Sequence, residues 1–125
     1  AIGGGGFIPA RILRTYINLP IVSTTINFYD QNDKIQSEPN IIQMIDKDII
    51  KNKNVLIVDE VDDTRKTLDF FINFLKNNYY QFKSLGVFVV NNKIKNKVSP
   101  IPQNVHYFSC CENKDVWINY PWDLV

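Results

Sequence analysis

The hydrophobic and polar positions change their spacing in the middle of the chain, between residues 55 and 78. Residues 55–58 read Val-Leu-Ile-Val, a short apolar run that is typical of a strand buried on both faces of a parallel sheet. After a polar turn, apolar residues recur at spacings of three and four, which predicts the buried face of a helix over residues 68–78. The apolar residues of that face are Leu68, Phe71, Ile72 and Leu75.

The same patterns predict further strands and one further helix. Residues 20–29 are rich in Ile, Val and Thr, residues 85–90 form another continuous apolar run, and residues 105–111 form the last apolar segment. Near the start, Pro9 suits the first turn of a helix that follows a run of glycines. Strands that alternate with helices predict an α/β fold with a mostly parallel sheet.

Two segments between these elements have weaker patterns. Residues 30–40 are polar, contain Pro39 and predict a loop. Residues 41–50 contain isoleucines whose spacing suits either a short helix or an edge strand, and the sequence leaves both open.

Composition and charge restrict the class of protein. A chain of 125 residues with 45% hydrophobic residues is long enough for one domain with a real core. The net charge of +1 gives no electrostatic reason to expect nucleic-acid binding, and no apolar run reaches the roughly 18 residues of a membrane span. Cys110 and Cys111 are adjacent, which excludes an ordinary disulfide framework and favours a reducing, cytosolic setting.

Candidate chemistry is concentrated in the polar turn between the predicted strand and helix. A loop at the carboxyl end of a parallel strand is where open α/β sheets bind ligands, and the free N–H groups of a helix start favour a phosphate. Acidic residues beside it suit a divalent metal or the hydroxyl groups of a sugar. The alternative is a solvated acidic turn without a ligand. The polar residues of this turn are Asp59, Glu60, Asp62, Asp63, Thr64, Arg65, Lys66 and Thr67.

The segment 55–68, VLIVDEVDDTRKTL, resembles the 5-phosphoribosyl 1-pyrophosphate (PRPP) motif of type I phosphoribosyltransferases, in the form of the fungal xanthine phosphoribosyltransferases. The resemblance implies that Asp59 and Glu60 lie beside the ribose hydroxyl groups and their Mg²⁺ ion. It implies that Asp63 binds near the purine N7 as the candidate general base. The loop around the 5′-phosphate would be formed by Thr64, Arg65, Lys66 and Thr67.

Arg65 departs from the commonest form of this motif. Glycine usually follows the first threonine there, and glycine allows a positive φ and a close approach of the backbone to a ligand. The sequence therefore predicts that the geometry of the loop departs from the commonest form at Arg65.

The segment GGGGFIPARIL is similar to the pyrophosphate loop of purine phosphoribosyltransferases, which often contains a non-proline cis peptide. The resemblance implies that the backbone of Gly3, Gly4 and Gly5 holds pyrophosphate. Gly4 stands where some relatives have a basic residue, so Arg11 and Arg14 are the next candidate cations. Family members have a helix and most of a strand before this loop, so we expect an amino-terminally truncated fold.

Two later segments resemble the parts of the family that bind the purine. A lysine after a strand bonds the exocyclic oxygen at C6, and Lys93 is the candidate, with Lys95 second; an ammonium group only donates, so it selects a 6-oxopurine. WINYPWD resembles the hood of xanthine-guanine phosphoribosyltransferases. It implies that Trp117 stacks on the purine, that the Ile118 carbonyl accepts from it, and that Asp123 contacts Mg²⁺. The alternatives are a solvated basic loop and two core tryptophans.

The resemblance covers nearly the whole chain and implies a single three-layer domain over residues 1–125, with a small hood at 112–125. Residues 30–40 would be a mobile lid. The implied activity transfers phosphoribosyl from PRPP to N9 of xanthine, guanine or hypoxanthine in purine salvage, with Mg²⁺ as cofactor, in a possible homodimer. The rival is a non-catalytic PRPP- or nucleotide-sensing domain. The sequence does not rank the three purines.

Overall fold

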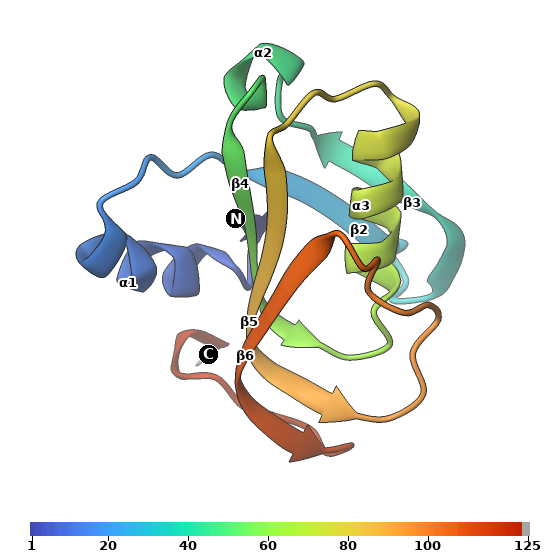
Figure 1. Cartoon of the computed structure of the whole chain (residues 1–125). Coiled ribbons are helices and arrows are strands. Elements are labelled where there is room, and N and C mark those ends of the chain that lie inside the picture. The colour runs from blue at the N-terminus through green and yellow to red at the C-terminus, as the bar shows by residue number, and fades with distance from the viewer. Residues whose placement is uncertain (124–125) are drawn as a thin grey trace.

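The computed structural model describes residues 1–123, in which strands and helices alternate along much of the chain (Figure 1). The strands are β1 (Ile2–Gly3), β2 (Thr24–Tyr29), β3 (Ile35–Gln43), β4 (Asn54–Asp62), β5 (Ser84–Ile94) and β6 (Val105–Lys114). The helices are α1 (Phe7–Ile17), α2 (Lys47–Ile50), α3 (Lys66–Asn77) and the 3₁₀ helix η1 (Pro121–Asp123). Figure 1 shows α1 and α3 on opposite sides of β4.

The strands form two sheets, each with its own direction of pairing. One sheet has the order β4-β5-β6, and all of its strands are parallel. The other has the order β1-β2-β3, in which β1 and β2 are parallel but β2 and β3 are antiparallel. The predicted α/β class and the mostly parallel pairing are therefore confirmed.

The core lies between α3 and the parallel sheet. The predicted apolar face of α3 is buried at each of its four positions, and Leu75 has no exposed surface. It packs against strand residues such as Val87 and Val89, which are also fully buried. An apolar helix stripe that meets an apolar sheet face is the packing that the residue spacing predicts. In the described part of the chain, no helix is both long and apolar enough to cross a membrane.

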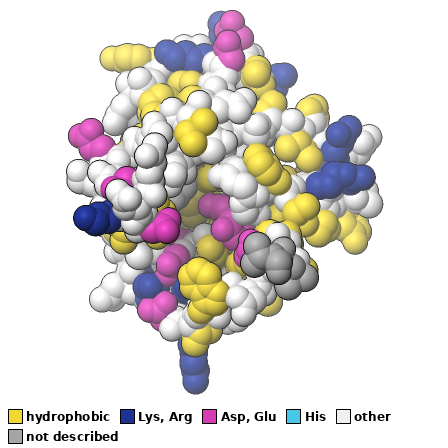
Figure 2. Space-filling view, turned by 180° about the vertical axis from the view of Figure 1, so that it is seen from behind, with side chains coloured by type: hydrophobic (Ala, Val, Ile, Leu, Met, Phe, Trp, Pro, Cys, Tyr) yellow, Lys and Arg dark blue, Asp and Glu magenta, His cyan; other side chains and the backbone are white. Residues whose placement is uncertain are grey.

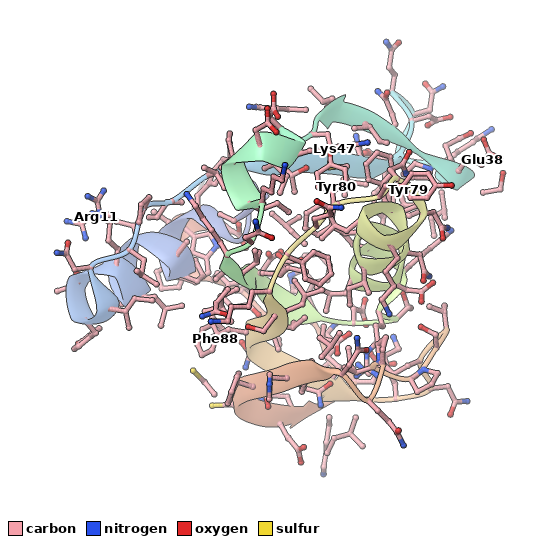
Figure 3. All side chains as sticks on the ribbon, turned by 45° about the horizontal axis from the view of Figure 1, so that its top comes forward. Arg11, Glu38, Lys47, Tyr79, Tyr80 and Phe88 are labelled. Atoms are coloured by element: carbon pink, nitrogen blue, oxygen red, sulfur yellow. The ribbon has the colours of Figure 1, made fainter. Side chains whose placement is uncertain are left out.

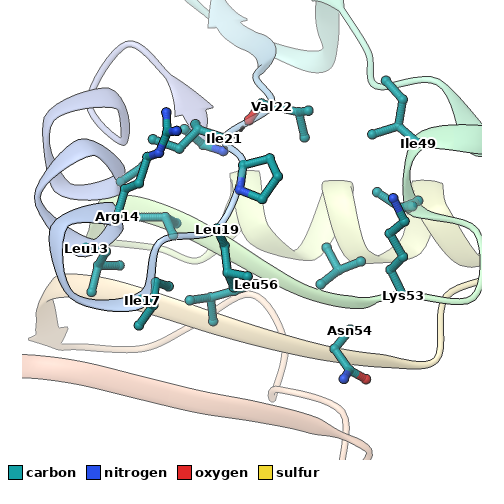
Figure 4. A pocket seen from close by; sticks show the side chains of 16 residues that line it. Leu13, Arg14, Ile17, Leu19, Ile21, Val22, Ile49, Lys53, Asn54 and Leu56 are labelled. Atoms are coloured by element: carbon teal, nitrogen blue, oxygen red, sulfur yellow. Dashed lines mark hydrogen bonds between the residues drawn. The ribbon is translucent and has the colours of Figure 1, made fainter.

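An apolar groove lies on the other side of β4, between that strand, α1 and residues 19–22 (Figure 4). Leu56 lines it and is 37% exposed, so the prediction that residues 55–58 are buried on both faces is wrong for this residue. The Leu56 side chain lies in the groove, where α1 and residues 19–22 cover this face of β4 only in part.

The loop predicted for residues 30–40 is confirmed at residues 30–34 only, and the strand β3 follows it. Residues 30–34 form a tight turn, because the Asp30 carboxylate accepts hydrogen bonds from the backbone N–H groups of Asn32 (2.8 Å) and Lys34 (2.9 Å). β3 then pairs back on β2 as an edge strand whose residues are almost all exposed. Such a strand needs no apolar alternation, which is why its composition predicts a loop. Pro39 is tolerated there because edge strands leave backbone N–H groups unpaired.

Other strands and helices also begin or end at residues that differ from the predicted ones. The strand predicted for residues 20–29 begins at Thr24, since β1 pairs only with Thr24 and Thr25. Residues 41–50 complete β3 and then form α2, so both open alternatives occur in sequence. The strands β4, β5 and β6 each continue past their apolar residues into polar ones, because backbone pairing between parallel strands does not require apolar side chains.

The buried face of α3 gives a direct test of this core. Leu75→Ala should lower the free energy of unfolding by about 2–5 kcal/mol, through lost burial and the cavity that remains. Urea denaturation followed by circular dichroism measures the change. Leu19→Ala is the matched control, because Leu19 is 56% exposed and its truncation should cost less than about 0.5 kcal/mol. Equal losses in the two variants would contradict the packing described.

Candidate active site

The polar ends of the parallel strands bring the predicted site residues to one edge of the sheet. β4 continues through Asp59 and Glu60 to Asp62, and β5 continues through Asn92 and Lys93 beside it. The polar turn predicted after residue 58 is therefore shorter than expected and begins at Asp63. Seen from behind, the surface shows acidic side chains gathered near a hollow in the middle of the face (Figure 2).

Asp59 and Glu60 form an acidic pair in which Asp59 is buried and Glu60 is half-buried. Burial raises the pKa of Asp59 well above its usual value, and the hydrogen bond and charge of Glu60 raise it further. The Glu60 backbone N–H donates to Asp59 Oδ1 at 2.9 Å, while Glu60 Oε2 is buried without a hydrogen-bond partner. Such a pair is costly without a cation beside it.

The glycine loop packs directly against this pair. A Cβ atom at Gly5 would collide with the Glu60 carboxylate, which would then have to move from its present position. The Gly3–Gly4 peptide is cis. Arg11, a candidate cation for this loop, points away at the outer side of α1 and donates to Thr15 Oγ1 at 3.0 Å (Figure 3). Arg14 lines the apolar groove.

The predicted phosphate loop leads into α3. Thr64 is exposed in this loop, Thr67 lies in the first turn of the helix, and no side chain caps the helix N-terminus. An uncapped helix start presents free N–H groups and a positive dipole end, which together favour an anion.

Two basic residues of this loop have side chains that are already engaged. The Arg65 guanidinium forms an ion pair with Asp62 Oδ2 at 2.8 Å. The Lys66 ammonium donates to the Gln36 carbonyl oxygen at 3.0 Å and lies 4.8 Å from the centre of the Phe28 ring. Lys66 therefore links the start of α3 to the β2–β3 hairpin. Within residues 1–123, the side chains of Thr64 and Thr67 make no such contact, in contrast to those of Arg65 and Lys66.

Asp63 lies between two lysines. Lys95 Nζ is 2.9 Å from Asp63 Oδ1, and Lys93 Nζ is 3.6 Å from the same oxygen. Partial burial alone would raise the pKa of Asp63, but the hydrogen bond from Lys95 and the charges of both lysines outweigh it and lower the pKa. Lys93 is buried within β5 and not in a loop after it, so the alternative of a solvated basic loop is wrong for this residue.

The hood residues differ in exposure. Trp117 is 84% exposed, so it is not a core residue, and its Nε1–H donates to Asn119 Oδ1 at 2.9 Å. Trp122 stacks on Tyr120 with ring centres 4.8 Å apart and a 12° angle between the planes. Ile118 is half-buried. Leu124 and Val125, which complete the predicted hood, lie outside the described residues.

Tyr120 joins the hood to the acidic pair. Its hydroxyl donates to Asn91 Oδ1 at 2.8 Å and lies 3.2 Å from the Glu60 carbonyl oxygen. Burial, followed by the charges of Glu60, Asp59 and Asp123, raises the pKa of Tyr120 to about 12. The charge of Asp123 therefore acts on the same hydroxyl group as the charges of Asp59 and Glu60.

The donor set agrees with a magnesium ion that shares its ligands with a substrate. Within residues 1–123, no group of three or more His, Cys, Asp or Glu side chains forms a ready-made metal cage. Mg²⁺ is usually held by one or two carboxylates together with substrate phosphates. Asp59 and Glu60 supply that number, and a cation would satisfy the buried, unpartnered Glu60 Oε2.

Three residues at this edge were missed by sequence reasoning. Lys97 donates to the carbonyl oxygens of Asp62 (2.7 Å) and Asp63 (2.6 Å), and the Tyr107 hydroxyl donates to Asp62 Oδ2 at 2.7 Å. Asp115 accepts from Lys95 at 3.0 Å. Lys97 and Asp115 lie in polar segments that carry no pattern. Tyr107 had a weak signal, since it alternates with exposed residues along the last strand.

Comparison with known proteins identifies the family. Residues 1–124 match the phosphoribosyl transferase domain. The chain is 36% identical to the hypoxanthine-guanine phosphoribosyltransferase of Schizosaccharomyces pombe, over 98% of this chain and 74% of that protein. It is 31% identical to xanthine phosphoribosyltransferase 1 of Saccharomyces cerevisiae, over 98% of this chain and 75% of that protein.

Solved structures agree. A Neisseria gonorrhoeae protein with bound ppGpp superposes with a TM-score of 0.87 at 43% identity, over 99% of this chain and 72% of that one. The purine phosphoribosyltransferase of Pyrococcus horikoshii superposes with a TM-score of 0.73 at 28% identity, over 100% of this chain and 75% of that one. The chain belongs to the phosphoribosyltransferase family, and its similarity is to the purine-specific members.

The pair of lysines around Asp63 gives a test that is independent of activity. Lys95→Ala removes the hydrogen bond and one of the two charges that lower the pKa of Asp63, so that pKa should rise toward the ordinary value of an aspartate. A carboxyl ¹³C NMR titration measures it. Lys114→Ala removes an exposed lysine from the same region and should leave the Asp63 pKa unchanged. An unshifted pKa in Lys95→Ala would contradict the geometry.

Proposed function

We propose that this protein transfers the 5-phosphoribosyl group from PRPP to N9 of a 6-oxopurine and releases pyrophosphate. The observation that carries the proposal is the ionised Asp63, held by Lys93 and Lys95 next to the uncapped start of α3. This edge combines a phosphate-binding helix start, a proton acceptor and an ammonium group that can select an oxo substituent. The named purine phosphoribosyltransferases among its relatives support the same activity.

PRPP would bind across β4 and the glycine loop. The backbone N–H groups at the start of α3, with Thr64 and Thr67, would hold the 5′-phosphate, and Arg65 and Lys66 would contribute through their backbone. The backbone of Gly3, Gly4 and Gly5 would hold the pyrophosphate, as in the family resemblance.

Asp59 and Glu60 would hold Mg²⁺, with Asp123 directly or through water. When bound, the ion would neutralise the negative charge that develops on the leaving pyrophosphate. The hydrogen bond from the Glu60 N–H group to Asp59 Oδ1 keeps the two proposed ligands next to each other, which supports this assignment.

The purine would bind between β5 and the hood. The buried Lys93 would donate to the exocyclic oxygen at C6, the exposed Trp117 ring would stack on the base, and the Ile118 carbonyl would accept from its edge. The C1′–oxygen bond to pyrophosphate breaks as the C1′–N9 bond forms, and Asp63 accepts the proton that the purine loses at N7.

The exposed, free cysteines Cys110 and Cys111 favour a reducing cytoplasm as the setting.

The decisive experiment measures pyrophosphate release from PRPP and Mg²⁺ with xanthine, guanine and hypoxanthine in turn. Asp63→Asn removes the proton acceptor and keeps the size of the side chain, so kcat should fall by about 100-fold or more with the fold intact. Circular dichroism checks the fold. Full turnover in this variant would remove Asp63 from the proposed chemistry.

Trp117 allows purine binding to be separated from PRPP binding. Because the ring is 84% exposed and packs against no core, Trp117→Ala should leave stability unchanged and raise the KM for the purine by about tenfold. The KM for PRPP should stay within about twofold, which steady-state kinetics with each substrate varied would measure. Equal increases in the two KM values would argue against stacking.

A second function, nucleotide sensing without turnover, is favoured by one observation. The Neisseria gonorrhoeae relative carries bound ppGpp and is 43% identical to this chain. ppGpp combines a guanine base with phosphate groups, which are the two chemical classes that this site is proposed to bind. Binding of ppGpp by calorimetry, with no pyrophosphate release for any of the three purines, would establish sensing over transfer.

A further inference from the structure

Arg65 has a backbone conformation that its side chain does not favour. Its φ of 69° lies in the left-handed region, and it is the first residue before α3. Among residues 1–123, the other non-glycine residues with positive φ are Asn18, Asp33, Asn52 and Tyr79. Three of these are Asn or Asp, which tolerate the left-handed region through local hydrogen bonds, and Tyr79 is an exposed turn residue. Arginine has no such local device, so something else must hold the loop.

The guanidinium of Arg65 is held by a buried carboxylate. The Asp62 side chain has no exposed surface, and its Oδ2 accepts from Arg65 Nη2 at 2.8 Å, from Arg65 Nε at 3.0 Å and from the Tyr107 hydroxyl at 2.7 Å. The guanidinium carbon also lies 5.4 Å from the centre of the Tyr107 ring. Because a fully buried carboxylate is stable only with such partners, Asp62 and Arg65 depend on each other.

A further set of contacts with this loop comes from residues 97–99. Lys97 donates to the carbonyl oxygens of Asp62 and Asp63, the Val98 N–H donates to the Thr64 carbonyl oxygen at 3.0 Å, and Arg65 Nη1 donates to the Ser99 carbonyl oxygen at 3.3 Å. The carbonyl groups of Asp63 and Thr64 therefore point toward residues 97–99. In a trans peptide the N–H group points opposite to the carbonyl group, so the N–H groups of Thr64 and Arg65 point away from residues 97–99.

We propose that the buried Asp62–Arg65 pair, with Tyr107 and Lys97, is a positioning device that orients the N–H groups of the 63–65 loop toward the 5′-phosphate of the substrate. Arg65 acts through its backbone on the phosphate and through its side chain on Asp62, and neither Asp62 nor Tyr107 touches the substrate. A glycine would adopt the positive φ at position 65 without strain. Here the ion pair behind the loop holds Arg65 in that conformation instead. This inference rests on the proposed function only for the identity of the ligand.

The test uses GMP, a 5′-phosphate product of the proposed reaction, and PRPP. Asp62→Asn removes the charge that holds Arg65, so the affinity for GMP by calorimetry should fall at least tenfold and the KM for PRPP should rise by a similar factor. The KM for the purine should stay within about twofold, which a general loss of structure would not allow. Asp48→Asn, an exposed acid on α2, is the matched control and should change neither value.

The Arg65→Gly substitution tests whether the Asp62–Arg65 pair orients the loop or only stabilises the fold. In the Asp62→Asn background, Arg65→Gly removes both the unpaired guanidinium and the backbone strain, so the double variant should recover most of the affinity for GMP. Arg65→Ala alone keeps the strain and removes the guanidinium from Asp62, so it should be the weakest binder of the set. If Asp62→Asn does not fold, Tyr107→Phe removes one hydrogen bond to Asp62 and should still weaken GMP binding by about threefold with an unchanged purine KM.

The outcomes separate this device from the proposed reaction. Turnover in the parent protein with an unchanged KM for PRPP in Asp62→Asn overturns the device and leaves the reaction. GMP binding without turnover, lost in Asp62→Asn and recovered in the double variant, supports the device and overturns the reaction. A parent protein that binds neither GMP nor PRPP overturns both, and a double variant no better than Asp62→Asn overturns the positioning role.

Discussion

The parallel pairing of β4 with β5 is the constraint on which the rest of the site depends. It aligns Asp59 with Val89 and Asp62 with Asn92, so the acidic end of one strand lies beside the basic end of the next. Lys93 then reaches Asp63 from the neighbouring strand, although thirty positions of sequence separate the two residues. Because carboxyl ends of parallel strands meet at one edge, a single pairing register assembles the acids, the lysines and the start of α3.

The site contains two buried carboxylates with opposite electrostatic surroundings. Asp62 is fully buried, but its Oδ2 is paired with Arg65 and Tyr107, and the Lys97 ammonium lies 3.6 Å from its Oδ1. Asp59 is buried beside another acid, and its pKa is raised in consequence. A carboxylate whose charge is already paired is suited to positioning its neighbours. An acidic pair that has no cation beside it is suited to binding one. This contrast separates the structural acid of the motif from the acids proposed to bind metal.

The apolar core and the site share α3 but use different parts of it. The buried face of α3 fixes the helix against the parallel sheet, and the helix start then presents its N–H groups at the sheet edge. The β2–β3 hairpin contacts the same helix start through Lys66 and the Gln36 carbonyl oxygen. The apolar groove on the far side of β4 contains none of the residues proposed for PRPP, purine or metal.

The sequence alone determined the elements whose residues alternate by burial: α3, the apolar halves of β4, β5 and β6, and the acidic motif between β4 and α3. It did not predict β3, since an exposed edge strand leaves no periodic pattern, nor the continuation of the strands into polar residues. Only the tertiary structure decided that Arg65 faces Asp62 and that Lys97 and Tyr107 hold the loop. The contacts of Lys97 and Tyr107 with Asp62 join residues more than thirty positions apart, and a local pattern of residue types carries no information about which distant side chains meet.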